Sequence, residues 1–244
     1  MTADVFAQSE WAVGVVIPAR DEETSITHCI QSITQALDAC SGLLHTWVAI
    51  VADSCSDRTV ARARQALGSR GTVLECAARS PGVARRIGVE SILDRFATHP
   101  PNALWIANTD ADSSVSRDWI DYQLSLAAQG YCAVAGIVRV ESIADLEPEA
   151  VRGLLSDYTV NADGSHSHVH GANFGIRADA YLDAGGWSHL ALAEDHCLWR
   201  RVRARNWRVI SSAQSVVTTS GRLTGRAIGG FAETLRRRID PLYA

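Results

Sequence analysis

Three acidic clusters of the chain could bind a cation or a polar ligand, and each directly follows a short apolar run. They are Asp21-Glu22-Glu23, Asp53 to Asp57, and Asp110-Ala111-Asp112. Alternate residues leaving a strand, such as Asp110 and Asp112, can aim one or both carboxylates at a hard divalent cation. Such a cation can neutralise a bound diphosphate. For a single cluster, loop solvation or helix capping is an equally good explanation, and Asp21 and Asp57 are the candidate N-caps.

A second kind of chemistry is suggested by Glu194 and Asp195, which begin a helical pattern that carries Leu198 and Val202. A carboxylate at the mouth of a sheet could act as a general base. Acidic residues are also common in the first turn of a helix, where they interact favourably with the helix dipole. The sequence alone leaves both interpretations open.

Three histidines, His166, His168 and His170, alternate along the chain. On a strand their side chains would face one side, where three imidazoles could bind zinc. The alternative is a polar loop from which only His170 enters a site.

These residues need strands and helices to position them, and the first half of the chain alternates between the two patterns. Apolar runs predict strands at 13–18, 47–51, 72–76 and 103–107, and amphipathic spacing predicts helices at 25–40, 58–67 and 83–96. The alternation predicts a parallel sheet with right-handed crossovers. Ligands of such sheets bind beyond the carboxyl ends of the strands, where the acidic clusters lie.

The second half has a less regular pattern. It predicts helices at 119–129, 149–160, 177–184 and 194–206, a strand at 132–140, short strands near 208–210 and 216–219, and a last helix at about 231–239. No repeat or linker divides the chain, so we expect one domain.

The composition excludes several classes of function. The chain has 244 residues, 47% of them hydrophobic and 20% charged, which is ordinary for a globular protein. All 23 basic side chains are arginines, so a P-loop lysine, a Schiff-base lysine and a lysine general base are excluded. The net charge of −4 argues against nucleic-acid binding. No apolar run predicts a transmembrane segment or a signal peptide, and the spacing of the six cysteines predicts reduced thiols and a cytoplasmic protein.

Seven motifs in register resemble glycosyltransferase family 2, with the GT-A fold. They are VVIPARDEE (15–23), VADSCSDRT (51–59), PGVARRIGVE (81–90), NTDADS (108–113), HGANFGIR (170–177), GGW (185–187) and AEDHCLW (193–199). The resemblance implies a single α/β domain of the GT-A type over residues 1–244, with a Rossmann-like, mainly parallel sheet, helices on both faces and a smaller mixed β region on the acceptor side. Its nucleotide-binding half would be about 13–113, its acceptor-side half about 114–230, and its C-terminal helix 231–244.

The resemblance also implies roles for individual residues. Those around the nucleoside and phosphates of a UDP- or GDP-sugar would be Pro18, Ala19, Arg20, Glu22, Asp53 (on the base), Arg85 (near the base or phosphates), Asp110 (near the ribose) and Ala111. Asp112, together with Asp110, would ligate Mn²⁺ or Mg²⁺ on the diphosphate. Asp195 would deprotonate the acceptor hydroxyl, with Glu194 orienting either Asp195 or the acceptor. The sugar and acceptor side would be lined by His170, Gly171 and Asn173.

The chain departs from the family near its C-terminus. Relatives often supply a further metal ligand there, frequently a histidine, but no histidine follows His196. The metal would then be bound more weakly, completed by water, or supported by Ser220. Arg222 and Arg226, in a glycine-punctuated loop, could instead clamp the diphosphate directly.

The resemblance and these residues together predict a metal-assisted, inverting sugar transferase that uses a nucleotide-diphosphate sugar. Some GT-A relatives retain the anomeric configuration, and the sequence leaves that alternative open. One alternative is a sugar-phosphate nucleotidyltransferase-like enzyme, which the absence of glycine and lysine from residues 18–22 disfavours. Another is a nucleotide-sugar-binding protein without turnover. The acceptor could be a small molecule, a peptide or a lipid head group. Arg236, Arg237 and Arg238 could contact an anionic membrane or a partner subunit, and a homodimer is compatible with the sequence.

Overall fold

The first half of the chain forms four parallel strands, as its alternating pattern predicts. The computed structural model describes residues 11–40, 45–140, 159–190 and 193–222. The strands are β1 (Ala12–Ala19), β2 (His45–Asp53), β3 (Gly71–Cys76) and β4 (Leu104–Asn108), and they are connected through α1 (Ile26–Ala39), α2 (Thr59–Leu67) and α3 (Pro81–Arg95). Each predicted strand and helix of this half is confirmed, with ends shifted by one or two residues.

The second half extends the same sheet. Its strands are β5 (Ser113–Val115), β6 (Ala133–Val140), β7 (Phe174–Arg177) and β8 (Val209–Thr219), and the order of the eight strands is β3-β2-β1-β4-β7-β6-β8-β5. Its helices are α4 (Trp119–Ala128), α6 (Ala178–Asp183) and α7 (Glu194–Ala204). β7 runs antiparallel to β4, so the two halves meet at the centre of one mixed sheet.

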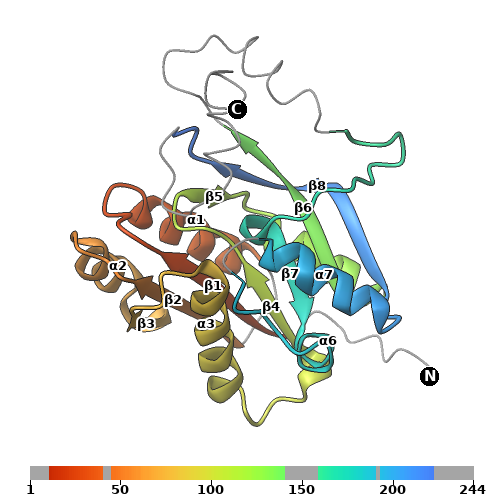
Figure 1. The fold of residues 1–244 in the computed structure, drawn as a ribbon, viewed down its shortest axis with the longest axis horizontal. Helices are drawn as coiled ribbons and strands as arrows, with labels where there is room; N and C mark the ends of the chain where they lie inside the picture. The colour runs from red at the N-terminus through yellow and green to blue at the C-terminus, as the bar shows by residue number, and fades with distance from the viewer. Residues whose placement is uncertain (1–10, 41–44, 141–158, 191–192, 223–244) are drawn as a thin grey trace.

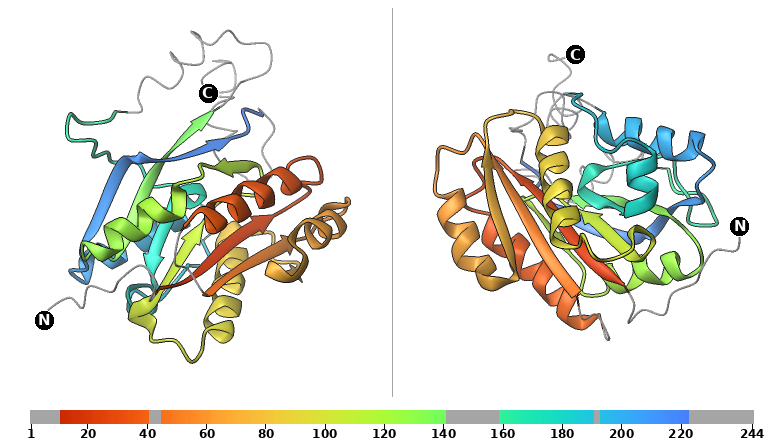
Figure 2. Two further views of the ribbon diagram at one scale, coloured as in Figure 1. Left: turned by 180° about the vertical axis from the view of Figure 1, so that it is seen from behind. Right: turned by 90° about the horizontal axis from the view of Figure 1, so that it is seen from below.

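Helices cover both faces of the sheet, as Figures 1 and 2 show from opposite sides. α1, α2 and α4 pack on one face over Val13, Val15 and Ile17, while α3, α6 and α7 pack on the other over Ala12 and Val16. Successive β1 side chains therefore enter opposite cores, which explains why this strand is a continuous apolar run. Among the described helices, none is long and apolar enough to cross a membrane.

Four elements differ from the sequence-based prediction. β5 and β7 were not predicted, and the two short strands expected at 208–210 and 216–219 form the single strand β8, whose register with β6 shifts between Gly136 and Ile137. The helix expected at 149–160 does not include Val160, which forms an isolated bridge with His166. The rest of that helix and the predicted C-terminal helix lie outside the described residues.

Candidate active site

The three acidic clusters lie at one edge of the sheet, because they follow the carboxyl ends of three neighbouring parallel strands. The register aligns Ala19 with Ala52, and Val16 with Asn108. Pro18 and Ala19 end β1 itself, and Arg20 begins the loop after it, partly exposed. The predicted convergence of these clusters is therefore confirmed.

The loops after β1 and β2 are bound to each other by their own acidic side chains. Asp57 accepts a hydrogen bond from the Thr59 N–H at 2.9 Å at the start of α2, but the N-cap position is Arg58 and not Asp57 as predicted. Asp21 does not cap α1: its carboxylate accepts from the N–H of Ser56 at 2.7 Å, and its φ of 51° is left-handed. Asp21, Asp57 and Cys55 are the one group of possible metal ligands found close together in the described part of the chain.

Asp53 ends β2 and is buried. Its two oxygens accept from the N–H groups of Arg79 and Ser80, each at 2.8 Å. Arg79 has a left-handed φ of 50°, a strained conformation that these hydrogen bonds support. Asp53 therefore fixes the loop that leads into α3, whatever else it binds.

Arg85 lies at the centre of the site, 3% exposed. Its guanidinium contacts Glu194 and also donates to Asp110 at 2.6 Å, and it lies 5.3 Å from the centre of the Trp187 ring. The prediction placed Arg85 beside the base or phosphates of a donor. The structure instead places it in a buried bridge between the end of β4 and the start of α7.

Glu194 and Asp195 begin α7 but have different surroundings. Glu194 is buried, and burial raises the pKa of its carboxyl while Arg85 acts in the opposite direction. Asp195 is partly exposed; one of its oxygens accepts from the Gly171 N–H at 3.0 Å, and the other accepts from the His196 N–H of its own helix at 2.7 Å. A Cβ atom at residue 171 would collide with the guanidinium of Arg85, which Asp110 and Glu194 hold in place, so glycine suits this position.

The three alternating histidines form a stack and not a converging set. The ring centres of His166 and His168, and of His168 and His170, are 6.0 Å apart, and the second pair is nearly parallel at 5°. Residues 167–170 belong to no strand. The zinc interpretation is therefore not supported, and the loop interpretation is the better one.

Asn173 was predicted on the acceptor side, but the structure shows it 1% exposed among protein partners. Its amide donates to the carbonyls of Ile137 and Ser215 at 2.8 and 2.9 Å, and its oxygen accepts from the Trp119 indole at 3.0 Å. Its side chain thus holds β6 and β8 together at the irregularity in their register.

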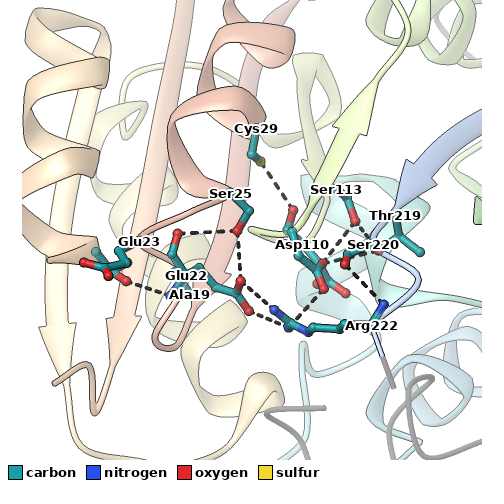
Figure 3. Close-up of polar contacts among 12 residues, drawn as sticks. Ala19, Glu22, Glu23, Ser25, Cys29, Asp110, Ser113, Thr219, Ser220 and Arg222 are labelled. Carbon is teal, nitrogen blue, oxygen red and sulfur yellow. Dashed lines mark hydrogen bonds and ion pairs between the residues drawn. The ribbon is translucent and has the colours of Figure 1, made fainter. Parts of the chain in front are cut away.

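Arg222 joins the first and third acidic clusters (Figure 3). Its guanidinium donates to both oxygens of Glu22, at 2.7 and 2.5 Å, and lies 3.0 Å from Asp112. Burial and the nearby Asp110 raise the pKa of Asp112 to about 6, although Arg222 opposes this shift. The sequence singled out all three residues and predicted that the clusters of Glu22 and Asp112 converge, but it gave no signal that Arg222 would bind both. Arg226 lies outside the described residues.

Two further residues contact Asp112: Ser113, which belongs to the NTDADS motif, and Thr219, which the sequence analysis did not place in the site. Ser113 and Thr219 donate to the Asp112 carboxylate at 3.4 and 3.3 Å, and the main-chain N–H of Ser220 donates to the Asp112 carbonyl at 3.1 Å. They come together because β5 pairs with β8, a pairing that was not predicted.

Comparison with known proteins identifies the family. The sequence profile described as Glycosyl transferase family 2 matches residues 14–184. The chain belongs to this family. No curated protein matches it at a significant level.

Solved structures similar to this family 2 transferase share its fold. The mannosyltransferase PcManGT from Pyrobaculum calidifontis, in complex with GDP-Man and Mn²⁺, is 16% identical with a TM-score of 0.60, and the match covers 98% of this chain and 64% of that one. S. aureus TarS 1–349 in complex with UDP-GlcNAc is 13% identical with a TM-score of 0.63, covering 90% and 61%. This chain thus matches about three fifths of the length of these neighbours. The GT-A fold is confirmed.

The residues of this transferase fit a divalent cation beside Asp112. Carboxylate oxygens are the ligands that Mg²⁺ and Mn²⁺ prefer. Asp112 and Glu22 are two mostly buried carboxylates that share one positive partner, Arg222. Asp110, the other predicted ligand, is instead bound by Arg85.

Replacing Asn173 with alanine is expected to destabilise the transferase by at least about 2 kcal/mol, because buried carbonyls and an indole N–H lose their partner. Urea unfolding measures the change. The matched control is Asn161→Ala, which removes an exposed amide bound to Ser165 and should cost less than about 0.5 kcal/mol. Equal costs at the two positions would contradict the structural role of Asn173.

Replacing His170 with asparagine is expected to make the transferase less sensitive to acid. Burial lowers the pKa of His170 from 6.5 to about 4, so between these pH values the unfolded chain binds a proton that the folded protein does not. Stability present above pH 6.5 is therefore lost as the pH falls, by about 2 kcal/mol at pH 5. Urea unfolding at pH 5 and pH 7.5 checks this, with the exposed His28→Asn as control. The same pH dependence in wild type and His170→Asn would show the prediction to be wrong.

Proposed function

We propose that this transferase moves a sugar from a UDP- or GDP-linked donor to an acceptor hydroxyl, with Asp195 as the general base. The observation that carries the proposal is the arrangement of two different acidic sites at one sheet edge. Glu22 and Asp112 are two mostly buried carboxylates that both contact Arg222. Asp195 is partly exposed, and a hydrogen bond from the Gly171 N–H orients its carboxylate. The ligands of the two neighbours, UDP-GlcNAc and GDP-Man, support a nucleotide-sugar donor.

The loops after β1 and β2 would hold the nucleoside. Residues 18–22 line the end of β1, and Asp53 lies at the end of the adjacent β2. A carboxylate has about four lone-pair sites, so Asp53 can accept a hydrogen bond from the base in addition to the two from the main chain. Asp110 and Ala111 would then lie toward the ribose.

The departing diphosphate would be stabilised at Asp112. A divalent cation there neutralises the charge that develops on the leaving group. Arg222 can donate two parallel hydrogen bonds to phosphate oxygens, a geometry that guanidinium groups favour. Arg226 is proposed as a second clamp.

Asp195 would accept the proton of the acceptor hydroxyl as that oxygen attacks the anomeric carbon. The hydrogen bond from Gly171 fixes one carboxylate oxygen of Asp195, which leaves lone pairs free for the hydroxyl. Attack opposite the departing diphosphate inverts the anomeric configuration. His170 is neutral near pH 7, because burial lowers its pKa, and lies beside Asp195 on the acceptor side.

A thermal-shift panel of nucleotides and sugar nucleotides, with and without Mn²⁺, tests the proposal. One base class should raise the melting temperature by about 5 °C at saturating concentration, and Mn²⁺ should increase that shift. Release of the free nucleoside diphosphate from the matching sugar nucleotide would then indicate sugar transfer. Nucleotidyl transfer would instead release pyrophosphate from a nucleoside triphosphate in the presence of a sugar phosphate. If no nucleotide stabilises the protein, the proposed function is wrong.

A further inference from the structure

Arg222 binds two carboxylates that lie far apart in the sequence. Its two terminal nitrogens contact both oxygens of Glu22, 200 residues earlier, and one of them also contacts Asp112. The side chains of Glu22 and Asp112 are only 5% and 16% exposed, and that of Arg222 is 28% exposed. The guanidinium therefore closes the outer side of a pair of mostly buried acids.

Glu22 and Asp112 depend on this one guanidinium for charge compensation. Among the described residues, Arg222 is the basic side chain that forms an ion pair with either of them. The other arginine of the site, Arg85, is bound by Asp110 and Glu194. Two mostly buried carboxylates that stay ionised without a cation between them would be costly, so the place between Glu22 and Asp112 favours a cation.

One oxygen of each carboxylate lies within 3.0 Å of the same nitrogen of Arg222. These two oxygens are therefore near enough to ligate one small ion after a modest adjustment, because such an ion binds oxygens at about 2.0–2.2 Å. A third contact adds to the site: Ser25 donates to Glu22 at 2.9 Å.

The surroundings of Arg222 leave room for its guanidinium to move away from Glu22 and Asp112 while the main chain before it stays in place. The main chain before Arg222 is anchored, because the Ser220 N–H donates to the Asp112 carbonyl at 3.1 Å. A cavity of about 500 Å³ adjoins Asp112 and Arg222 and is lined largely by hydroxyl side chains, among them Ser25, Ser113 and Thr218. Its size leaves room for polar groups beside the displaced side chain.

We propose that Glu22 and Asp112 form a single cation site for which the guanidinium of Arg222 and a divalent cation compete, and that the diphosphate of the donor decides between them. This inference rests on the proposed function. A diphosphate offers Arg222 an alternative anionic partner. When the guanidinium moves to the diphosphate, both carboxylates become free to bind the metal. The nucleotide and the metal then strengthen each other's binding by the same factor, as linkage requires. Glu22 is thereby assigned as a metal ligand.

The test measures Mn²⁺ binding by the electron paramagnetic resonance signal of the free ion, alone and with UDP or GDP. In the absence of nucleotide, Arg222→Gln should bind Mn²⁺ at least about tenfold more tightly than wild type, because the competing guanidinium is gone. The coupling between nucleotide and Mn²⁺ should shrink in this variant. Arg205→Gln, which removes an exposed ion pair with Asp183, is the matched control and should bind as wild type does.

A second variant tests the role of Glu22. Glu22→Gln in the Arg222→Gln background should lose most of the gained Mn²⁺ affinity. Arg222→Lys keeps the positive charge but cannot form the bidentate contact with Glu22, so its Mn²⁺ affinity should lie between those of wild type and Arg222→Gln. Unchanged or weaker Mn²⁺ binding by Arg222→Gln would overturn the competition. Retained affinity in the double variant would overturn Glu22 as a ligand.

The two proposals fail in different ways. If neither UDP nor GDP binds to wild type, the proposed donor is wrong, and the experiments with Mn²⁺ alone still decide whether Arg222 and the metal compete. If nucleotides bind but Arg222→Gln leaves the affinity for Mn²⁺ alone unchanged, the donor proposal stands and the competition is wrong.

Discussion

Asp195→Asn is expected to lower kcat by about 10²–10⁴-fold, the usual contribution of a general base. Asparagine keeps the shape of the side chain and can still accept the hydrogen bond from the Gly171 N–H. It cannot take a proton, so the chemical step should slow while the donor Kd changes little. The rate of sugar transfer gives kcat; until the acceptor is known, the rate of donor hydrolysis is measured in its place. Calorimetry gives the donor Kd.

The competing explanation is that Asp195 only stabilises the start of α7, where an acidic residue contributes about 0.3–1 kcal/mol. The matched control is Asp118→Asn, an exposed acid at the start of α4, which should affect stability slightly and kcat not at all. A kcat near that of wild type for Asp195→Asn would remove this residue from the mechanism.

Arg85→Met is expected to destabilise the fold by about 3–5 kcal/mol, the cost of removing one partner from a buried ion pair. Methionine approximates the aliphatic part of the side chain but leaves Glu194, 8% exposed, without its cation. Chemical denaturation measures the loss. Adding Glu194→Gln to this variant should recover part of the stability, because the unpaired buried charge is then gone.

The neighbouring arginine of the same helix provides the control. Arg86 forms an exposed ion pair with Glu90, four residues along α3, and Arg86→Met should cost less than about 1 kcal/mol. A loss this small for Arg85→Met would mean that Glu194 is not a buried charge held by Arg85.

The sequence predicted the parallel half of the fold because its pattern is local. Each strand there is an apolar run of at least five residues, and an amphipathic helical pattern follows each of the first three. Strands β1, β2 and β3 are neighbours in the sheet in the order of the chain, and β4 then pairs with β1 on its other side. β5 and β7 have three and four residues, too few for a periodic signal. Their existence depends on partners far along the chain, such as the pairing of β5 with β8.

The same limit applies to the site. The positions of Asp53, Asp112 and Asp195 in the fold could be predicted because strand ends and helix starts have a recognisable sequence context. The partners of Arg85 could not, since its contact with Glu194 joins residues 109 positions apart. Asn173 shows the opposite error: a motif placed it near the acceptor, whereas its hydrogen bonds are all used within the protein.

The antiparallel contact between β4 and β7 has a consequence for dividing this protein into modules. β4 lies in the middle of the sheet, between β1 and β7. A fragment that stops near residue 113 would therefore expose the full length of β4 as an unprotected edge, a known route to aggregation. It would also lack Glu194, the second partner of Arg85. The first half, which is proposed to bind the nucleotide, is thus not a module that can be exchanged by itself. Chimeras that aim to change the acceptor need their junctions in surface loops of the second half.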